Sequence, residues 1–149
     1  MASILVTGCS KGIGMATALV LGRAGHTVHA TMRDPRGAPE LEETAAREKL
    51  PITVSAMDVD SDESVTKAIG GIQKAHGPLD VLVNNAGIEK HALFQDVTED
   101  EFDAVLDVNL KGVFFATQAF VRACQRGGHG GKVINISSVH EDIAFPNFA

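Results

Sequence analysis

Short apolar runs alternate with segments of helical periodicity along the whole chain. The apolar runs fall at residues 3–7, 27–32, 52–57, 80–85 and 132–137, and the spacing predicts a helix over 13–25 and others between the later runs. Such alternation is typical of βαβ units on a parallel sheet. We therefore predict an α/β fold, a doubly wound parallel sheet in a single domain spanning residues 1–149.

Local signals mark where several helices begin and end. Pro39 opens one helix, with acidic residues in its first turn. The next helix has capping-box-like spacing between Asp60 and Glu63, and Gly77 followed by Pro78 ends it. One apolar stripe runs along this helix: Val65, Ala68, Ile69, Ile72 and Ala75.

Two further helices precede the last apolar run. Thr98 and Glu101 have capping-box spacing and open the first of them, and a second helix is expected from about residue 109 to 126. This second helix is apolar on more than one side, a pattern typical of helices that are covered twice. A partner subunit is one candidate for the second cover. The strand at 132–137 is nearly continuously apolar, as expected for a central parallel strand.

Composition narrows the classes of partner. The net charge is −6, so the sequence shows no basic stripe for nucleic acid. No apolar run approaches the roughly 18 residues of a membrane helix, and the start "MASILV" resembles a first strand more than a signal peptide, which indicates a cytoplasmic protein. Cys9 and Cys124 are expected to be reduced thiols.

The histidines are dispersed along the sequence, without the paired spacing of a zinc site. We expect loop or surface positions for them, and no metal site. The residues concerned are His26, His29, His76, His91 and His129.

The glycine-rich stretch "VTGCSKGIG" lies between the first strand and the first helix. Gly8 suits a tight turn, Gly12 leaves room for a phosphate beside the backbone, and Gly14 allows the helix to pack close to the strand. A pyrophosphate would bind at the helix N-terminus, where amide groups and the dipole attract anions. The alternative is a glycine-rich turn that binds nothing.

Two cations favour one of the two nicotinamide dinucleotides. Arg33 follows the second strand and Lys11 lies within the glycine turn, so both could contact the 2′-phosphate that distinguishes NADP(H) from NAD(H). The rival interpretation assigns Asp34 to the ribose or leaves both cations as surface charges. We predict NADP(H) as the preferred coenzyme.

With these motifs in register, the chain resembles the short-chain dehydrogenase/reductase family along its whole length. The shared markers are the turn "TGCSKGIG", Asp58-Val59 after the third strand, "NNAG" after the fourth, Asn109 in "VNLKG" and a serine after the fifth. The resemblance implies a Rossmann-like domain in which Asp58 contacts the adenine. The implied coenzyme-binding residues are Gly8, Ser10, Lys11, Gly12, Ile13, Gly14, Arg33, Asp58, Val59, Asn85, Ala86 and Gly87.

The resemblance also implies hydride transfer between nicotinamide and a small alcohol or carbonyl substrate, often in a homo-oligomer. Ser138 would hydrogen-bond the substrate oxygen, with Ser137 turned away, and Asn109 would support proton transfer; Ser138 could also be only a strand-terminating cap. The family's tyrosine and its following lysine would fall just beyond residue 149, and the chain contains no tyrosine.

We therefore expect a domain that is incomplete at its carboxyl end relative to the family, binding nucleotide with negligible turnover. The alternative is a naturally short, non-catalytic dinucleotide-binding or interaction module that covers its open fifth strand with a partner.

Overall fold

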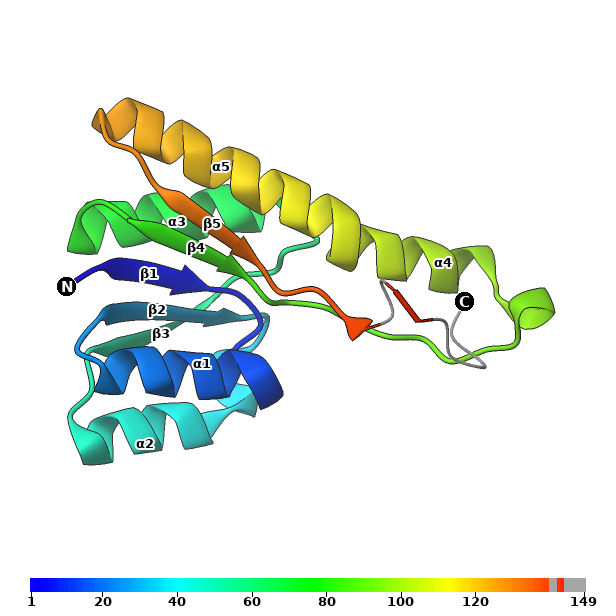
Figure 1. Ribbon diagram of the computed structural model, residues 1–149, viewed down its shortest axis with the longest axis horizontal. Helices are drawn as coiled ribbons and strands as arrows, with labels where there is room; N and C mark the ends of the chain where they lie inside the picture. The colour runs from blue at the N-terminus through cyan, green and yellow to red at the C-terminus, as the bar shows by residue number, and fades with distance from the viewer. Residues whose placement is uncertain (140–141, 144–149) are drawn as a thin grey trace.

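A five-stranded parallel sheet forms the centre of the structure, a computed structural model that describes residues 1–139 and 142–143 (Figure 1). Its strands are β1 (Ser3–Val6), β2 (Thr27–Met32), β3 (Ile52–Ala56), β4 (Val81–Asn84) and β5 (Lys132–Asn135). They are ordered β3-β2-β1-β4-β5, so the strand order reverses beside β1. This topology confirms the predicted doubly wound, Rossmann-like fold.

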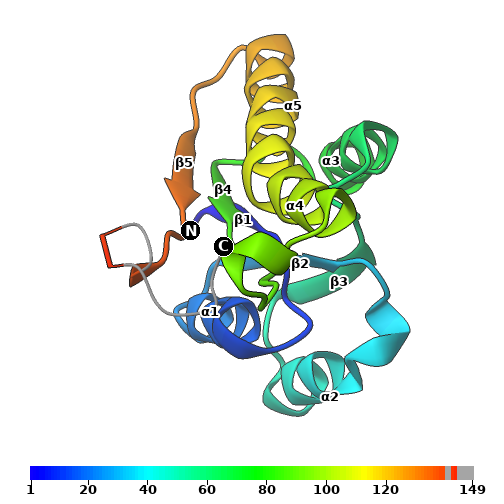
Figure 2. The same cartoon turned by 90° about the vertical axis from the view of Figure 1, so that its right-hand side faces the viewer.

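Helices cover both faces of this sheet (Figure 2). The helices α1 (Gly12–Arg23) and α2 (Pro39–Glu48) lie on one face, and a bidentate ion pair joins them, with Arg23 Nε 2.7 Å from Glu48 Oε2. On the other face α3 (Asp62–His76) packs beside α5 (Gly112–Gly127). Short 3₁₀ turns, Pro35–Gly37 and Phe94–Asp96, precede α2 and α4 (Glu99–Leu106).

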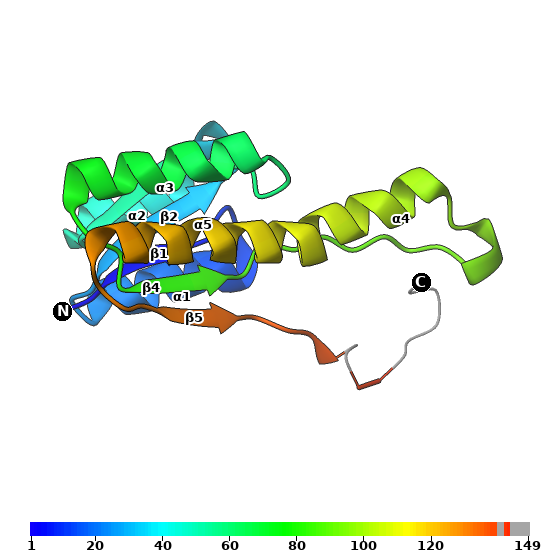
Figure 3. The same ribbon diagram turned by 90° about the horizontal axis from the view of Figure 1, so that it is seen from above.

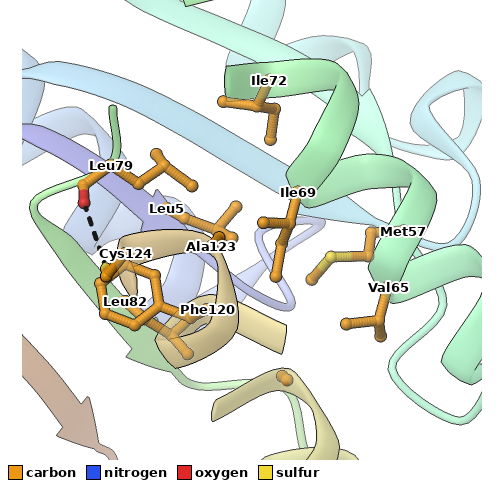
Figure 4. Packing of buried hydrophobic residues seen from close by; sticks show 11 residues of the cluster. Leu5, Met57, Val65, Ile69, Ile72, Leu79, Leu82, Phe120, Ala123 and Cys124 are labelled. Carbon is orange, nitrogen blue, oxygen red and sulfur yellow. Dashed lines mark hydrogen bonds between the residues drawn. The ribbon is translucent and has the colours of Figure 1, made fainter. Parts of the chain in front are cut away.

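Alternate side chains of the strands enter two separate cores, one on each face of the sheet. Leu5 of β1 points into the core beneath α3 and α5, where Leu82, Ile69 and Phe120 are also buried (Figure 4). Its neighbours Ile4 and Val6 point into the opposite core, beneath α1 and α2. Parallel strands covered on both faces bury residues of both orientations, which explains why these runs show no apolar and polar alternation.

The start of α3 corrects one expectation. The N-cap is Ser61, whose Oγ accepts the Ser64 N–H at 3.3 Å, and not Asp60. The Asp60 N–H instead donates to Asp58 Oδ1 at 3.2 Å, which places Asp60 in the turn before the helix. The predicted end of the helix at Gly77 is confirmed.

The last two helices follow each other directly, as the sequence predicts. The capping box of Thr98 and Glu101 opens α4 as expected. The chain then passes through a π-helical turn, Asp107–Lys111, directly into α5 without a loop (Figure 3). Residues Glu99–Gly127 therefore form one continuous helical stretch of 29 residues.

This long helix also corrects the expectation about membrane-length segments, because its length and composition would allow it to cross a membrane. Its α5 part packs against α3 and β4, and it buries Ala116, Phe120 and Ala123 in the core. Packing within the fold therefore accounts for one apolar face. The other face leaves Leu110, Phe114 and Val121 exposed, and cover by a partner subunit stays a prediction.

β5 is more exposed than expected, and His29 is more buried than expected. β5 lies at the edge of the sheet within the described residues, and all four of its side chains are exposed, so it is not a covered central strand there. His29 lies in the middle of β2 with 1% of its surface exposed, which corrects its assignment to a loop or the surface.

Cys9 and Cys124 are both free and buried, and burial raises the pKa of the Cys9 thiol to about 12.

Candidate functional site

A cleft of about 1010 Å³ lies at the carboxyl ends of the strands, on the side toward which the strand arrows point in Figure 1. It contains the point where the strand order reverses, the position at which doubly wound sheets bind ligands. The structure brings every predicted site residue to the wall of this cleft: Gly8, Ser10, Lys11, Gly12, Ile13, Gly14, Arg33, Asp58, Val59, Asn85, Ala86, Gly87, Asn109 and Ser138.

The floor of the cleft is the glycine turn between β1 and α1. Gly8 has a φ of +70°, and a Cβ added there would lie 2.7 Å from the Cα of Ala86. At Gly14 an added Cβ would collide with the carbonyl group of Gly8 and with the side-chain amide of Asn85. Both positions therefore need glycine, because the first strand, the first helix and the loop after β4 meet there without room for a side chain.

The N-terminus of α1 opens into the cleft without a competing acceptor. No side chain caps this end of the helix, and its first turn contains no acidic residue. The first amide N–H groups of a helix have no intrahelical acceptor, and the helix dipole adds partial positive charge there. This end of α1 therefore suits an anion such as a pyrophosphate.

The two predicted phosphate-binding cations both line the cleft, and the rival acidic residue does not. Within the described residues, no carboxylate pairs with Lys11 or Arg33. Asp34 instead bonds to its neighbour Arg36, whose Nε donates to Asp34 Oδ1 at 2.9 Å and whose Nη2 donates to Oδ2 at 3.0 Å. These hydrogen bonds from Arg36 lower the pKa of Asp34.

Thr7, which the sequence motifs did not single out, ties the two walls of the cleft together. Its Oγ1 accepts the backbone N–H groups of Asn85 at 3.0 Å and Ala86 at 2.9 Å. In return, Asn85 Nδ2 donates to the carbonyls of Thr7 at 2.9 Å and Gly8 at 3.2 Å. The loop after β4 is thus fixed on the glycine turn, and the signal for Thr7 was its place between strand and glycine in "VTG".

Asp58 and Val59 form the wall beside β3. The Asp58 backbone N–H donates to Ser64 Oγ at 2.9 Å, so the first turn of α3 holds this residue in place. Val59 packs against Gly112, where an added Cβ would come within 3.1 Å of the Val59 carbonyl oxygen. The Asp58 carboxylate accepts a bond from Asp60 N–H and retains further acceptor capacity toward the cleft.

Asn109 lies in the π-helical turn and uses both ends of its side-chain amide on one residue. Its Oδ1 accepts the Ile88 N–H and its Nδ2 donates to the Ile88 carbonyl, each at 2.9 Å. These two bonds hold the loop that follows Gly87. The direct geometric role of Asn109 is therefore to position this loop, and π-helical turns often occur at functional sites.

The chain after β5 forms the remaining wall, and there both Ser137 and Ser138 line the cleft. Two bonds fix its direction, since the Ile136 N–H donates to the Asn84 carbonyl at 2.9 Å and Asn84 Nδ2 donates to Asn135 Oδ1 at 2.9 Å. Asn84 is buried and also donates to Thr117 Oγ1 on α5 at 3.0 Å. It is a second residue whose positioning role the sequence motifs left undefined.

A histidine and a glutamate side chain also line this cleft. His91 Nε2 lies 3.8 Å from Glu89 Oε2, and both side chains are more than half exposed. Their place after "NNAG" was the one signal in the sequence that could have indicated them. Among the described residues there is no cluster of three or more His, Cys, Asp or Glu side chains that could hold a metal ion.

Comparison with known proteins places the chain among oxidoreductases. The model of the short chain dehydrogenase family matches residues 2–149. The chain is 33% identical over 148 residues to a gluconate 5-dehydrogenase of Gluconobacter oxydans, covering 99% of this chain and 57% of that protein. It is 40% identical over 138 residues to an acetoacetyl-CoA reductase of Shinella zoogloeoides, covering 91% and 54%.

A solved structure is also similar to nearly the whole chain. The gluconate 5-dehydrogenase of Burkholderia cenocepacia, determined with NADP and tartrate, superposes with a TM-score of 0.89 at 35% identity, covering 99% of this chain and 58% of that one. The chain thus spans somewhat more than half the length of the relatives that it matches.

Proposed function

Because the chain belongs to the short-chain dehydrogenase/reductase family, we propose that its 149 residues form the coenzyme-binding part of an NADP(H)-dependent oxidoreductase for small alcohol or carbonyl compounds. The bound coenzyme supplies or accepts the hydride at its nicotinamide ring. The relatives named above act on different substrates, so the proposal names no single alcohol or carbonyl compound.

One observation carries the choice of coenzyme. Lys11 and Arg33 lie in the cleft without a carboxylate partner among the described residues, whereas Asp34 is bonded to Arg36 outside the cleft lining. A ribose with free hydroxyls would need an acidic acceptor at this point, and a 2′-phosphate needs cations. The NADP bound to the similar gluconate 5-dehydrogenase of Burkholderia cenocepacia supports the same choice.

Other residues of the cleft have distinct roles in this proposal. The amides at the start of α1, with Ser10, Gly12 and Ile13, bind the pyrophosphate. Asp58 accepts a hydrogen bond from the adenine amino group. The loop of Asn85, Ala86 and Gly87 lies against the coenzyme, held there by Thr7 and Asn109.

Ser138 is proposed to donate a hydrogen bond to the substrate oxygen. Proton transfer in the family uses a tyrosine, and these 149 residues contain none. A missing general acid lowers rates by about 10² to 10⁴-fold. We therefore propose that the 149-residue chain binds coenzyme without appreciable turnover, in the cytoplasm, and as a homo-oligomer through the exposed face of the long helix.

Calorimetric titration of the 149-residue chain with NADPH and NADH tests this proposal. NADPH should bind more tightly than NADH. Substituting Arg33→Ala should weaken NADPH binding by about 10- to 100-fold, because a charge-assisted hydrogen bond contributes about 1.5–3 kcal/mol, and should leave NADH binding unchanged.

The matched control is Arg36→Ala, which removes an exposed arginine three residues away that is bonded to Asp34 and not to the cleft. It should leave both affinities unchanged. Equal or tighter binding of NADH by the unmodified chain would contradict the coenzyme assignment. Measurable hydride transfer to an alcohol or carbonyl by the homogeneous preparation would contradict the predicted inactivity.

A further inference from the structure

The middle of β2 buries an ionisable side chain, His29, that the proposed function does not use. His29 is the register partner of Leu5, whose side chain lies in the core beneath α3. Adjacent strands of a sheet place paired side chains on the same face, so His29 also points toward α3. It is 1% exposed, a burial expected for an apolar residue at this position.

Only one of the two ring nitrogens of His29 has a polar partner. Nε2 lies 3.2 Å from Ser3 Oγ on β1. Nδ1 is buried and has no hydrogen-bond partner in the part of the chain that the structure describes. A buried N–H without an acceptor is less tolerable than a buried acceptor without a donor, so the favoured tautomer carries its proton on Nε2 and donates to Ser3.

A second histidine lies against the first. His76 is the exposed last residue of α3, and its ring centroid lies 4.9 Å from that of His29 at an interplanar angle of 47°. His76 thus connects the end of α3 to the buried ring.

We propose that His29 is a proton-sensitive latch: neutral His29 lets the last turn of α3 pack on β1 and β2, and its protonation releases that turn. This inference uses none of the cleft residues and stands independently of the coenzyme proposal.

The surroundings of His29 explain why the protonated ring cannot stay in place. The imidazolium has two N–H donors, and among the described residues only Ser3 offers a hydrogen-bond partner, to Nε2. From β3 the register neighbour is uncharged Thr53, and from α3 the neighbour is His76, which can only repel a second positive charge. The nearby carboxylate of Asp80 accepts the Ser3 backbone N–H at 2.8 Å and makes no hydrogen bond with the ring.

The pKa of His29 has the corresponding direction. Burial, followed by the charge on His76, lowers this pKa from 6.5 to about 4. Because the folded-state pKa of a base is depressed, the stabilisation by neutral His29 is complete above pH 6.5 and is lost as the pH falls from 6.5 toward 4. Over that interval the equilibrium constant for opening the last turn of α3 should rise by up to about 300-fold.

Hydrogen exchange on the 149-residue chain at pH 7 and pH 5, corrected for intrinsic exchange rates, tests the latch. Amides in the last turn of α3 should lose protection by roughly tenfold or more at pH 5, while amides of α1 keep theirs. Long-range ¹H–¹⁵N spectra of the imidazoles should show His29 titrating together with that loss. Equal protection of α3 at both pH values would overturn the proposal.

His29→Leu supplies the decisive variant, because leucine fills a similar volume and cannot be protonated. It should abolish the acid effect on α3, whereas the control His91→Gln, which removes an exposed histidine, should retain the full effect. If His29→Leu does not fold, His76→Gln serves instead and should reduce the effect, since one cause of the lowered pKa is removed. An acid effect that persists unchanged in the folded His29→Leu chain, or in His76→Gln where it stands in, would refute the latch.

Discussion

The amino and carboxyl ends of the strands use their polar groups in opposite ways. At the amino edge the donors are consumed internally, since the Ser3 N–H bonds to Asp80 and the Ala2 N–H donates to Nδ1 of His26 at 3.1 Å. At the carboxyl edge the first amides of α1, together with Lys11 and Arg33, face a cleft. At the amino end these donors are already paired within the protein. At the carboxyl end the donors remain available to a ligand.

This difference shows that polar residues at strand ends do not by themselves indicate a binding site. What distinguishes the carboxyl edge is the combination of close backbone contacts at glycine and a helix end without a side-chain cap. The helix end without a side-chain cap leaves N–H groups that a ligand can use. The substitutions below test the comparison, beginning with the largest expected effect.

The closest backbone contact is at Gly14, on the carboxyl edge. Gly14→Ala should lower the free energy of unfolding by about 3 kcal/mol or more, because the new Cβ would collide with the Gly8 carbonyl and cannot be relieved by a rotamer change. Urea denaturation followed by circular dichroism measures the change.

Gly70→Ala is the matched control for this prediction. Gly70 lies within α3, and no atom lies within 4 Å of the position that a Cβ would take. This substitution should stabilise the chain by about 0.5–1 kcal/mol through helix propensity. Similar losses at both glycines would mean that the close contact at Gly14 is not what requires glycine there.

A smaller effect is expected at Thr7, where one hydroxyl joins the two walls of the cleft. Thr7→Val should cost about 2–3 kcal/mol of unfolding free energy, because the N–H groups of Asn85 and Ala86 lose their acceptor. It should also weaken NADPH binding in calorimetry.

The control is Thr53→Val on β3, whose side chain is exposed and makes no hydrogen bond with the residues that the structure describes. It should change stability by less than about 0.5 kcal/mol. Unchanged coenzyme affinity in a folded Thr7→Val chain would contradict the role of Thr7 in holding the loop.

The smallest effect belongs to the amino edge. Asp80→Ala removes the acceptor of the Ser3 N–H and should lower the unfolding free energy by about 1 kcal/mol, the usual contribution of one hydrogen bond. NADPH affinity should stay the same, because this residue lies at the opposite edge from the cleft. A loss of affinity comparable to that of Arg33→Ala would remove the distinction between the two edges.

Much of this architecture could be predicted from residue patterns. The five apolar runs gave the strands, and the glycine turn with the "NNAG" stretch indicated residues that the structure brings to one cleft. Burial of His29 was also predictable in principle, since a central parallel strand is covered on both faces and its middle positions are buried whatever their type. The dispersed spacing of the histidines argues against a metal site but says nothing of their burial.

Other features could not be read from local patterns. The cap of α3 depends on a hydrogen bond that turns Asp60 aside, so two adjacent polar residues are equivalent in sequence but not in space. The exposure of β5 depends on what covers it and not on its composition, since β1 has similar residues and is buried. Thr7 acts through contacts with residues nearly eighty positions away.

The π-helical turn Asp107–Lys111 shifts the direction of the side chains between the two parts of the long helix. Each α-helical residue advances the side-chain direction by about 100°, and a π turn accommodates roughly one residue more than an α turn. The side of α5 that faces the core is therefore rotated about the helix axis relative to the side of α4 that an unbroken α-helix would place in line with it. Deleting one residue in this turn would remove the shift between α4 and α5. Asn109 could then no longer hydrogen-bond with Ile88 while Phe120 stays buried in the core.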